Sequence, residues 1–226
     1  MHNIIFNMAG MHRHGTAFYD FLRLRKTFFV DQLGWDIPHD DEVEMDQYDN
    51  PQAWYTLVLN DDGEVVGGAR NLPTTATWGS HSYMLKDASE GKLGSIPPNV
   101  MSEIVVNERV WETTRMVISD SLQTHAERTE CLDLIVSGIQ EITTGHGATE
   151  VLCLTLPPMV RALRSLGWPA ERRGAPYHCP DDGRTYAVLA IPPRTRLRSS
   201  QAATPASLPT PTHRAQPAMV HAPQKD

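Results

Sequence analysis

Cysteine is scarce in this 226-residue sequence, which contains three cysteines in all. Cys131, Cys153 and Cys179 lie far apart, and no two of them form a C-x-x-C pair. An odd number of well-separated cysteines argues against a disulfide framework. The missing C-x-x-C pair argues against a structural zinc site. We therefore expect no bound metal and a reducing, cytoplasmic environment.

Long apolar runs and an excess of positive charge are missing as well. No apolar run approaches the roughly 18 residues that a membrane helix needs. The N-terminus, "MHNIIFNMAGMHRHG", has no basic segment followed by a long apolar core, so we do not expect a signal peptide. The net charge of −7 argues against a general nucleic-acid binder. These absences predict a protein with no membrane segment and no nucleic-acid partner.

The composition changes sharply near the end of the chain. The full sequence is 40% hydrophobic and 21% charged, which is typical of a globular domain. After Pro192 the chain becomes rich in Pro, Ala, Ser and Thr and poor in residues that could form a core. Such a segment cannot bury enough surface to offset its ordering entropy. We predict one domain over residues 1–194 and a disordered tail over 195–226.

Hydrophobic periodicity and turn residues predict a mixed α/β fold. A stretch of helical spacing begins after Thr16, a candidate N-cap, and ends at Gly34. "NDDG" between two β-rich runs at 53–75 is a strong hairpin signal. The remaining predicted strands are 3–7, 109–118, 149–156 and 184–192, and the predicted helices are 16–33, 120–144 and 158–166. This order favours a mixed sheet with helices on both faces.

The stretch "EMDQYD", residues 44–49, concentrates three carboxylates within six residues. One interpretation is a solvated acidic loop, and the other is a pocket for a cationic ligand. Arg25 and Arg70 lie in segments where burial is expected, and buried charges need partners. Asp46 and Asp49 can supply those partners. A buried ion-pair network that only fixes the loop to the core remains an alternative to a binding site.

The predicted strand "RVWETTRMVI" carries two further charged residues, Glu112 and Arg115. Residues three apart in a strand face opposite sides of the sheet unless a β-bulge intervenes. The sequence alone leaves open whether these two side chains meet.

Four motifs, in order and at matching spacing, resemble those of the acyl-homoserine lactone synthases, the autoinducer synthases of bacterial quorum sensing. They are "LRKTFFVDQLGW", "EMDQYD", "VVGGARNLPTT" and "WETTR", and they fall within residues 19–118. "MVRALRSLGWPAERRG" is similar to a later helix of the same family. The positions that match the motifs are Arg25, Phe29, Trp35, Asp46, Asp49, Arg70, Glu112 and Arg115.

The resemblance implies a GNAT-like α-β-α sandwich with a V-shaped central sheet. It also implies two substrates and no permanently bound cofactor. S-adenosylmethionine (SAM) supplies an amine, which attacks an acyl thioester carried by acyl carrier protein or coenzyme A. The homoserine moiety then cyclises through its carboxylate, releasing methylthioadenosine and an acyl-homoserine lactone.

The resemblance further implies residue roles. The expected catalytic residues are Glu112, Arg115, Asp46 and Arg70, with Glu112 a direct or water-mediated base. Expected contacts to SAM come from Arg25, Phe29, Trp35, Asp46, Asp49 and Arg115. Backbone N–H groups at the split between strands would bind the thioester oxyanion. Met116, Leu152 and Leu154 would line an acyl pocket, although such residues are core in most folds.

Two departures from the expected patterns bear on the substrates. "ISDSLQTHAER" contains no glycine, whereas many CoA-dependent GNAT enzymes carry a Gly-rich pyrophosphate loop there, so generic acetyl-CoA use is disfavoured. "YMLKD" lacks the aromatic residue that usually follows shortly after it, and Ala88 and Ser89 stand there instead. The sequence therefore does not indicate which residues form the wall of the acyl pocket and of the SAM pocket. The sequence indicates neither the acyl group nor the oligomeric state.

Three further interpretations stay open at the level of sequence. "RALRSLGWPAERR" offers Arg161, Arg164, Arg172 and Arg173 either as a docking patch for an acidic carrier protein or as a solvated helix face. A GNAT-like N-acyltransferase with another amine acceptor would leave SAM intact. A non-catalytic relative would use its charged residues as structural ion pairs.

Overall fold

The computed structural model describes residues 1–193, so the predicted tail at 195–226 lies outside the described residues. The strands are β1 (His2–Asn7), β2 (Trp54–Leu59), β3 (Val65–Pro73), β4 (Val110–Ile118), β5 (Glu150–Thr155), β6 (Glu171–Arg172), β7 (Tyr177–His178) and β8 (Thr185–Ile191). The helices are α1 (Ala17–Arg25), α2 (Met84–Ser89), α3 (His125–Gly145) and α4 (Met159–Ser165), with a 3-10 turn η1 (Met11–His14) and a π-helical segment η2 (Lys26–Gln32). No helix within residues 1–193 has the length and apolar character needed to cross a membrane.

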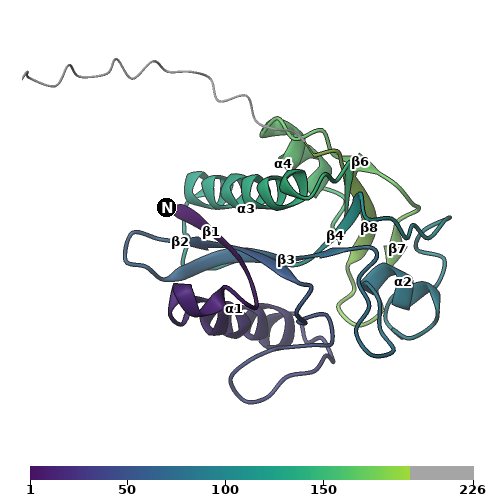
Figure 1. Ribbon diagram of the computed structural model, residues 1–226, viewed down its shortest axis with the longest axis horizontal. Helices are drawn as coiled ribbons and strands as arrows, with labels where there is room; N and C mark the ends of the chain where they lie inside the picture. The colour runs from purple at the N-terminus through teal and green to yellow at the C-terminus, as the bar shows by residue number, and fades with distance from the viewer. Residues whose placement is uncertain (194–226) are drawn as a thin grey trace, which may run out of the picture. The chain divides into compact units, whose positions relative to one another are not determined.

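The strands form one mixed sheet in the order β1-β2-β3-β4-β5-β8-β6, with β7 pairing against β8. All neighbours are antiparallel except β4 and β5, which are parallel. Figure 1 shows α1 against one face of the sheet and α3 with α4 against the other. The predicted mixed sheet with helices on both faces is confirmed.

The sheet splits between β4 and β5. Their pairing runs from Val110 opposite Glu150 to Thr113 opposite Cys153 and then stops, although both strands continue. The two edges diverge beyond this point, which gives the V shape expected of a GNAT-like sheet. The split creates a gap in which a substrate can lie between two strand edges.

A β-bulge on β4 lies beside the split. Arg70 pairs with Thr114 and Gly68 with Val117, so two residues of β4 oppose one residue of β3. Arg115 occupies this bulge with φ at 53°, a left-handed conformation that non-glycine residues seldom adopt. The bulge breaks the alternation that would otherwise have put Arg115 and Glu112 on opposite faces.

Gly68 allows α1 to approach this part of the sheet. A Cβ atom built at Gly68 would lie 2.6 Å from Leu57 Cδ2 and 2.9 Å from Phe21 Cε2. Phe21 and Leu57 are both fully buried. The absence of a side chain at position 68 therefore brings α1, and with it Arg25, directly over β3.

Several predicted elements differ in detail from the structure. The helix expected over 16–33 changes to the π-helical η2 at Lys26, and Gly34 ends it with φ at 70°. Thr16 is the N-cap residue, as predicted, but its side chain makes no capping hydrogen bond, because its hydroxyl donates to the Asp20 carboxylate. The helix expected from residue 120 begins at His125, behind a capping box formed by Thr124 and Glu127. The short elements α2, β6 and β7 were not predicted.

Candidate active site

A closed ring of alternating charges links α1, the 44–49 segment, β3 and β4. Its members, in order around the ring, are Arg25, Glu44, Arg115, Asp46, Arg70 and Asp49. Each carboxylate contacts two arginines, and each arginine contacts two carboxylates. The six contacts measure 2.7 Å (Arg25–Glu44), 3.1 Å (Glu44–Arg115), 2.8 Å (Arg115–Asp46), 2.6 Å (Asp46–Arg70), 2.8 Å (Arg70–Asp49) and 2.8 Å (Asp49–Arg25).

The ring is neutral as a whole, since three guanidinium groups balance three carboxylates. Burial alone would raise the pKa of Asp46, but Arg70 and Arg115 hold it below the usual range. Burial opposes ionisation of Asp49 in the same way, and Arg70 with Arg25 lowers the pKa of that carboxyl strongly. Asp46 and Asp49 therefore stay ionised inside the protein. The acidic stretch 44–49 is accordingly a paired network and not an open anionic surface.

Further hydrogen bonds fix the ring in one geometry. Arg25 donates to both oxygens of Asp49, at 2.8 and 2.9 Å, in a bidentate pair. Asp49 also accepts the Tyr55 hydroxyl at 2.9 Å, and Arg70 Nε donates to Thr114 Oγ1 at 3.1 Å. Because Arg25 and Arg70 are fully buried, they cannot reorient without leaving a charge unpaired.

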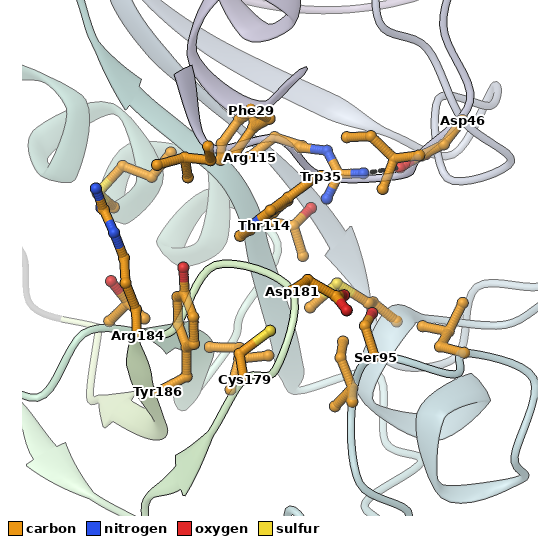
Figure 2. Close-up of a pocket in the computed structure, with 18 of the residues that line it drawn as sticks. Phe29, Trp35, Asp46, Ser95, Thr114, Arg115, Cys179, Asp181, Arg184 and Tyr186 are labelled. Carbon is orange, nitrogen blue, oxygen red and sulfur yellow. Dashed lines mark hydrogen bonds and ion pairs between the residues drawn. The ribbon is translucent and has the colours of Figure 1, made fainter. Parts of the chain in front are cut away.

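A cavity of about 660 Å³ opens beside the ring, where β4 and β5 separate. Thr114, Arg115 and Met116 of β4 line it together with Cys153, Leu154 and Thr155 of β5. In Figure 2, Phe29, Trp35, Asp46 and Arg115 lie along one wall, opposite Cys179 and Tyr186 from the β7–β8 hairpin. Two ring members, Asp46 and Arg115, thus face the cavity, and the other four are not among its lining residues.

Aromatic side chains cover this wall. The rings of Phe29 and Trp35 stack with centroids 4.9 Å apart, and the Arg115 guanidinium carbon lies 5.4 Å from the Phe29 centroid. Further along, the lining includes Met84, Leu93, Ile96, Leu156 and Met159. The cavity therefore combines the Asp46 carboxylate and the Arg115 guanidinium of the ring, and further charged side chains, with stacked aromatics and an apolar part.

Glu112 lies on β4 near the cavity but not in its wall. Its carboxylate is 1% exposed and accepts the backbone N–H groups of Met84 at 2.8 Å and Leu85 at 2.9 Å. These are the first two residues of α2, so Glu112 caps a helix whose N-cap residue Tyr83 has no side-chain cap. Burial raises the pKa of Glu112 to about 7, even though both N–H groups favour the ionised form.

A second buried carboxylate, Asp87 of α2, organises the neighbouring wall. It accepts hydrogen bonds from the Tyr48 hydroxyl at 2.9 Å, Ser82 N–H at 3.1 Å and Lys92 Nζ at 3.2 Å, and it pairs with His81 Nδ1 at 2.9 Å. Burial would raise the pKa of Asp87, but these partners lower it overall. Tyr48 and Lys92 both line the cavity. Asp87 therefore ties the 44–49 segment to the wall that follows α2.

Comparison with known proteins identifies the family. A family model described as autoinducer synthase matches residues 10–193. A curated acyl-homoserine-lactone synthase of Ralstonia nicotianae is 30% identical over 184 residues, covering 74% of this chain and 84% of that protein. The chain belongs to the autoinducer synthase family.

Other relatives agree with this assignment. An acyl-homoserine-lactone synthase of Agrobacterium fabrum is 29% identical to the chain and covers 81% of it, and 82% of that protein is matched. The crystal structure of TofI, in a ternary complex with an inhibitor and MTA, aligns with a TM-score of 0.66 at 26% identity over 85% of this chain and 91% of that chain. The synthase thus has the GNAT-like fold that its motifs predicted.

The structure brings most of the predicted site residues of the synthase into one place. Phe29, Trp35, Asp46 and Arg115 line the cavity, and the predicted pairing of Arg25 and Arg70 with carboxylates is confirmed. The other predicted members lie behind the wall: Arg25, Asp49, Arg70 and Glu112. The motifs suggested contacts to SAM for Arg25 and Asp49 and catalytic roles for Arg70 and Glu112, and none of these four side chains is among the residues that line the cavity. Their buried side chains position Asp46, Arg115 and α2 instead.

The predicted acyl pocket needs one correction. Met116 and Leu154 line the cavity, but Leu152 does not. Leu152 is 1% exposed and belongs to the core cluster that includes Leu85 and Val188. The reason is the position of the split, because Leu152 still pairs with Glu112 of β4 whereas Leu154 lies past the last pair.

Three parts of the site were missed from the sequence. No role was predicted for Glu44, although it connects Arg25 to Arg115. The wall at 92–96 falls in a stretch without periodicity, and β7, the first strand of the β7–β8 hairpin, has only two residues. The one available signal was "YMLKD", whose buried Asp87 organises this wall.

Proposed function

We propose that the synthase transfers an acyl group from a thioester to the amine of SAM and then closes the lactone. Family membership and a relative solved with MTA, the by-product expected of this reaction, support the proposal. The observation that carries it is the aromatic wall of the cavity, where the Asp46 carboxylate and the Arg115 guanidinium lie next to the stacked rings of Phe29 and Trp35. This combination suits an amino-acid group attached to a sulfonium and an adenine.

The two ring members that line the cavity would hold the amino-acid end of SAM. Asp46 would accept the ammonium group, and Arg115 would bind the carboxylate. Phe29 and Trp35 would contact the sulfonium or the adenine, because aromatic faces attract cations and stack on flat rings. Since the ring is neutral, it would bind a zwitterion without leaving an excess charge in the protein.

The acylation step requires a neutral amine, so a base must accept one proton. Glu112 is proposed for this task because a pKa of about 7 matches the operating pH of a general base. Its carboxylate does not line the cavity, so the proton would travel through a bound water. The amine attacks the thioester carbonyl, a C–N bond forms, the C–S bond breaks, and the thiolate leaves with a proton.

The thioester would lie in the split between β4 and β5. Past Thr113 and Cys153 the two strand edges no longer pair with each other, so peptide N–H groups there could stabilise the oxyanion. In the second step the carboxylate of the acylated SAM attacks its own γ-carbon. The C–S bond of the sulfonium breaks, its electron pair stays on sulfur, and methylthioadenosine leaves with the lactone as the second product.

The donor is either an acyl carrier protein or coenzyme A. The predicted basic patch is only partly available, because Arg164 Nε donates to the Ala170 carbonyl and Arg173 pairs with Glu150. Arg161 and Arg172 are exposed and would contact an acidic carrier protein. Replacing both with glutamine would weaken use of a carrier-protein donor and leave a CoA donor unaffected.

Mass spectrometry of the purified protein with SAM and a panel of acyl and aryl thioesters on both carriers tests the proposal. We expect methylthioadenosine and an acyl-homoserine lactone in equal amounts. An N-acylated product with SAM untouched would favour an acyltransferase with another amine acceptor. No product from the full panel would favour a protein that only binds a thioester or a partner.

A further inference from the structure

The turn between β7 and β8 lies across the cavity from the aromatic wall (Figure 2). It is a compact turn: Cys179 N–H donates to the Arg184 carbonyl at 2.8 Å, and Gly183 adopts φ at 66°. Within it, Asp182 Oδ1 accepts the Arg184 N–H at 2.9 Å. One carboxylate oxygen of Asp182 thus fixes the turn, which leaves the other free to contact groups outside it.

Asp182 Oδ2 accepts two hydrogen bonds from the cavity wall. The indole Nε1 of Trp35 donates at 2.9 Å, and the Tyr186 hydroxyl donates at 2.5 Å. Trp35 precedes Asp182 by 147 residues and comes from the other side of the split sheet. The ring of Trp35 lies 6.1 Å from Tyr186 and 4.9 Å from Phe29. A single carboxylate therefore joins the two walls of the cavity.

The hydrogen bond from Trp35 to Asp182 is charge-assisted. Burial would raise the pKa of Asp182, but the Tyr186 and Trp35 donors and the Arg184 N–H lower it overall. The carboxylate is thus ionised at neutral pH, and a bond to an ionised acceptor is roughly twice as strong as a neutral one. Trp35 follows Gly34 in a segment without helix or strand, so its backbone alone does not fix the indole.

We propose that Asp182 is a positioning residue, which holds the indole of Trp35 against Phe29 and thereby completes the surface that receives SAM. The inference rests on the proposed function, because it assigns SAM to this wall. The carboxylate does not itself touch substrate. Asp182 fixes the orientation of the Trp35 indole, which would contact SAM, so the binding surface is preorganised before SAM binds. The groups that carry out acyl transfer lie elsewhere and are unaffected.

Steady-state kinetics of Asp182→Asn test the first consequence. We expect the KM for SAM to rise roughly tenfold, the loss typical of one hydrogen bond to a charged group, with kcat and the KM for the thioester nearly unchanged. The matched control is Asp62→Asn, because Asp62 also precedes a positive-φ glycine in a "DDG" hairpin turn, far from the cavity lining. In a Trp35→Phe background, Asp182→Asn should add no further change.

Fluorine NMR of the protein labelled with 5-fluorotryptophan tests the second consequence. The chain has five tryptophans, and Trp35→Phe assigns the relevant resonance by its disappearance. We expect Asp182→Asn to shift or broaden the Trp35 signal and to leave the other four in place. Tyr186→Phe, which keeps the bond to Trp35, should move that signal less. If Asp182→Asn folds poorly, Trp35→Phe removes the donor of the same bond and should raise the KM for SAM in the same way.

An unmoved Trp35 resonance together with an unchanged KM for SAM would overturn the proposal. A moved resonance with an unchanged KM would overturn it as well, because the contact would then not serve SAM binding. If the wild-type protein makes no lactone, the proposed function fails on its own. The proposal is then decided by titrating SAM while the Trp35 resonance is observed in the wild type and in Asp182→Asn.

Discussion

Replacement of Asp49 by asparagine should destabilise the protein far more than the loss of any surface ion pair. Asp49 is 6% exposed, accepts two bonds from Arg25 and contacts Arg70 at 2.8 Å. The amide keeps the size of the side chain but removes the charge between two buried guanidinium groups. Breaking a buried ion pair from one side costs about 3–5 kcal/mol, because the other charge stays buried and unpaired.

Urea unfolding at neutral pH measures this loss of unfolding free energy directly. Thermal unfolding gives a second measure: for a domain of this size, each kcal/mol lowers the melting temperature by about 2–4 °C, so the melting temperature should fall by about 6–20 °C. Glu42→Gln is the control, since it breaks the exposed Arg23–Glu42 pair and should change stability much less. The double variant Arg25→Met with Asp49→Leu restores neutrality and should be less destabilised than Asp49→Asn alone.

The pH dependence of stability gives an independent check. The folded-state pKa of Asp49 is lowered, so its contribution is complete above the unfolded pKa of about 3.9 and is lost as the pH falls further. Wild-type stability should therefore fall more steeply below pH ~4 than that of Asp49→Asn. A loss under about 1 kcal/mol in urea, or parallel pH curves, would refute the reasoning about the ring.

Three further predictions concern catalysis and specificity. If Glu112 is the base, kcat/KM should rise with pH through an apparent pKa of about 7, and Glu112→Gln should abolish this rise. If a folded Glu112→Gln variant still shows the rise in its pH–rate profile, Glu112 is not the base. Asp46→Asn should abolish lactone formation in a folded protein, as circular dichroism and a turnover assay would show together, and a variant that keeps more than about half of the wild-type rate would contradict the site assignment. Leu154 lines the cavity, so Leu154→Ala should shift the preferred acyl chain toward longer groups in a competition assay. Leu152 lies in the core, so Leu152→Ala should lower the free energy of unfolding by about 2–5 kcal/mol without changing the preferred acyl chain.

The sequence predicted the elements whose signals are local. The hairpin at "NDDG", the buried strand at 149–156 and the helix ended by Gly34 follow from turn chemistry and periodicity, and all three are present. The helix over 16–33 was recognised, but its change to π-helical geometry was not. Hydrogen bonds from i to i+5 over seven residues leave the overall apolar pattern nearly unchanged, so periodicity cannot detect them.

The parts of the site that were missed depend on tertiary structure. No residue pattern marks the bulge at Arg115, because an arginine has no intrinsic preference for positive φ. Which leucine of β5 reaches the cavity depends on where β4 and β5 stop pairing, which is a property of two strands together. The role of Asp87 was hidden for a related reason, since its partners Tyr48, His81 and Lys92 come from three separate segments of the chain.

The closed ring of charges also constrains how this sequence can change over evolutionary time. Each member has two neighbours of opposite sign, so any single loss brings two like charges face to face across the vacated position. Compensation must come from a residue that is adjacent in space but 19 to 71 positions away in the chain. A single substitution at any of these six positions is therefore expected to destabilise the protein. Across related sequences we expect its six positions to be retained together or to be exchanged in concert.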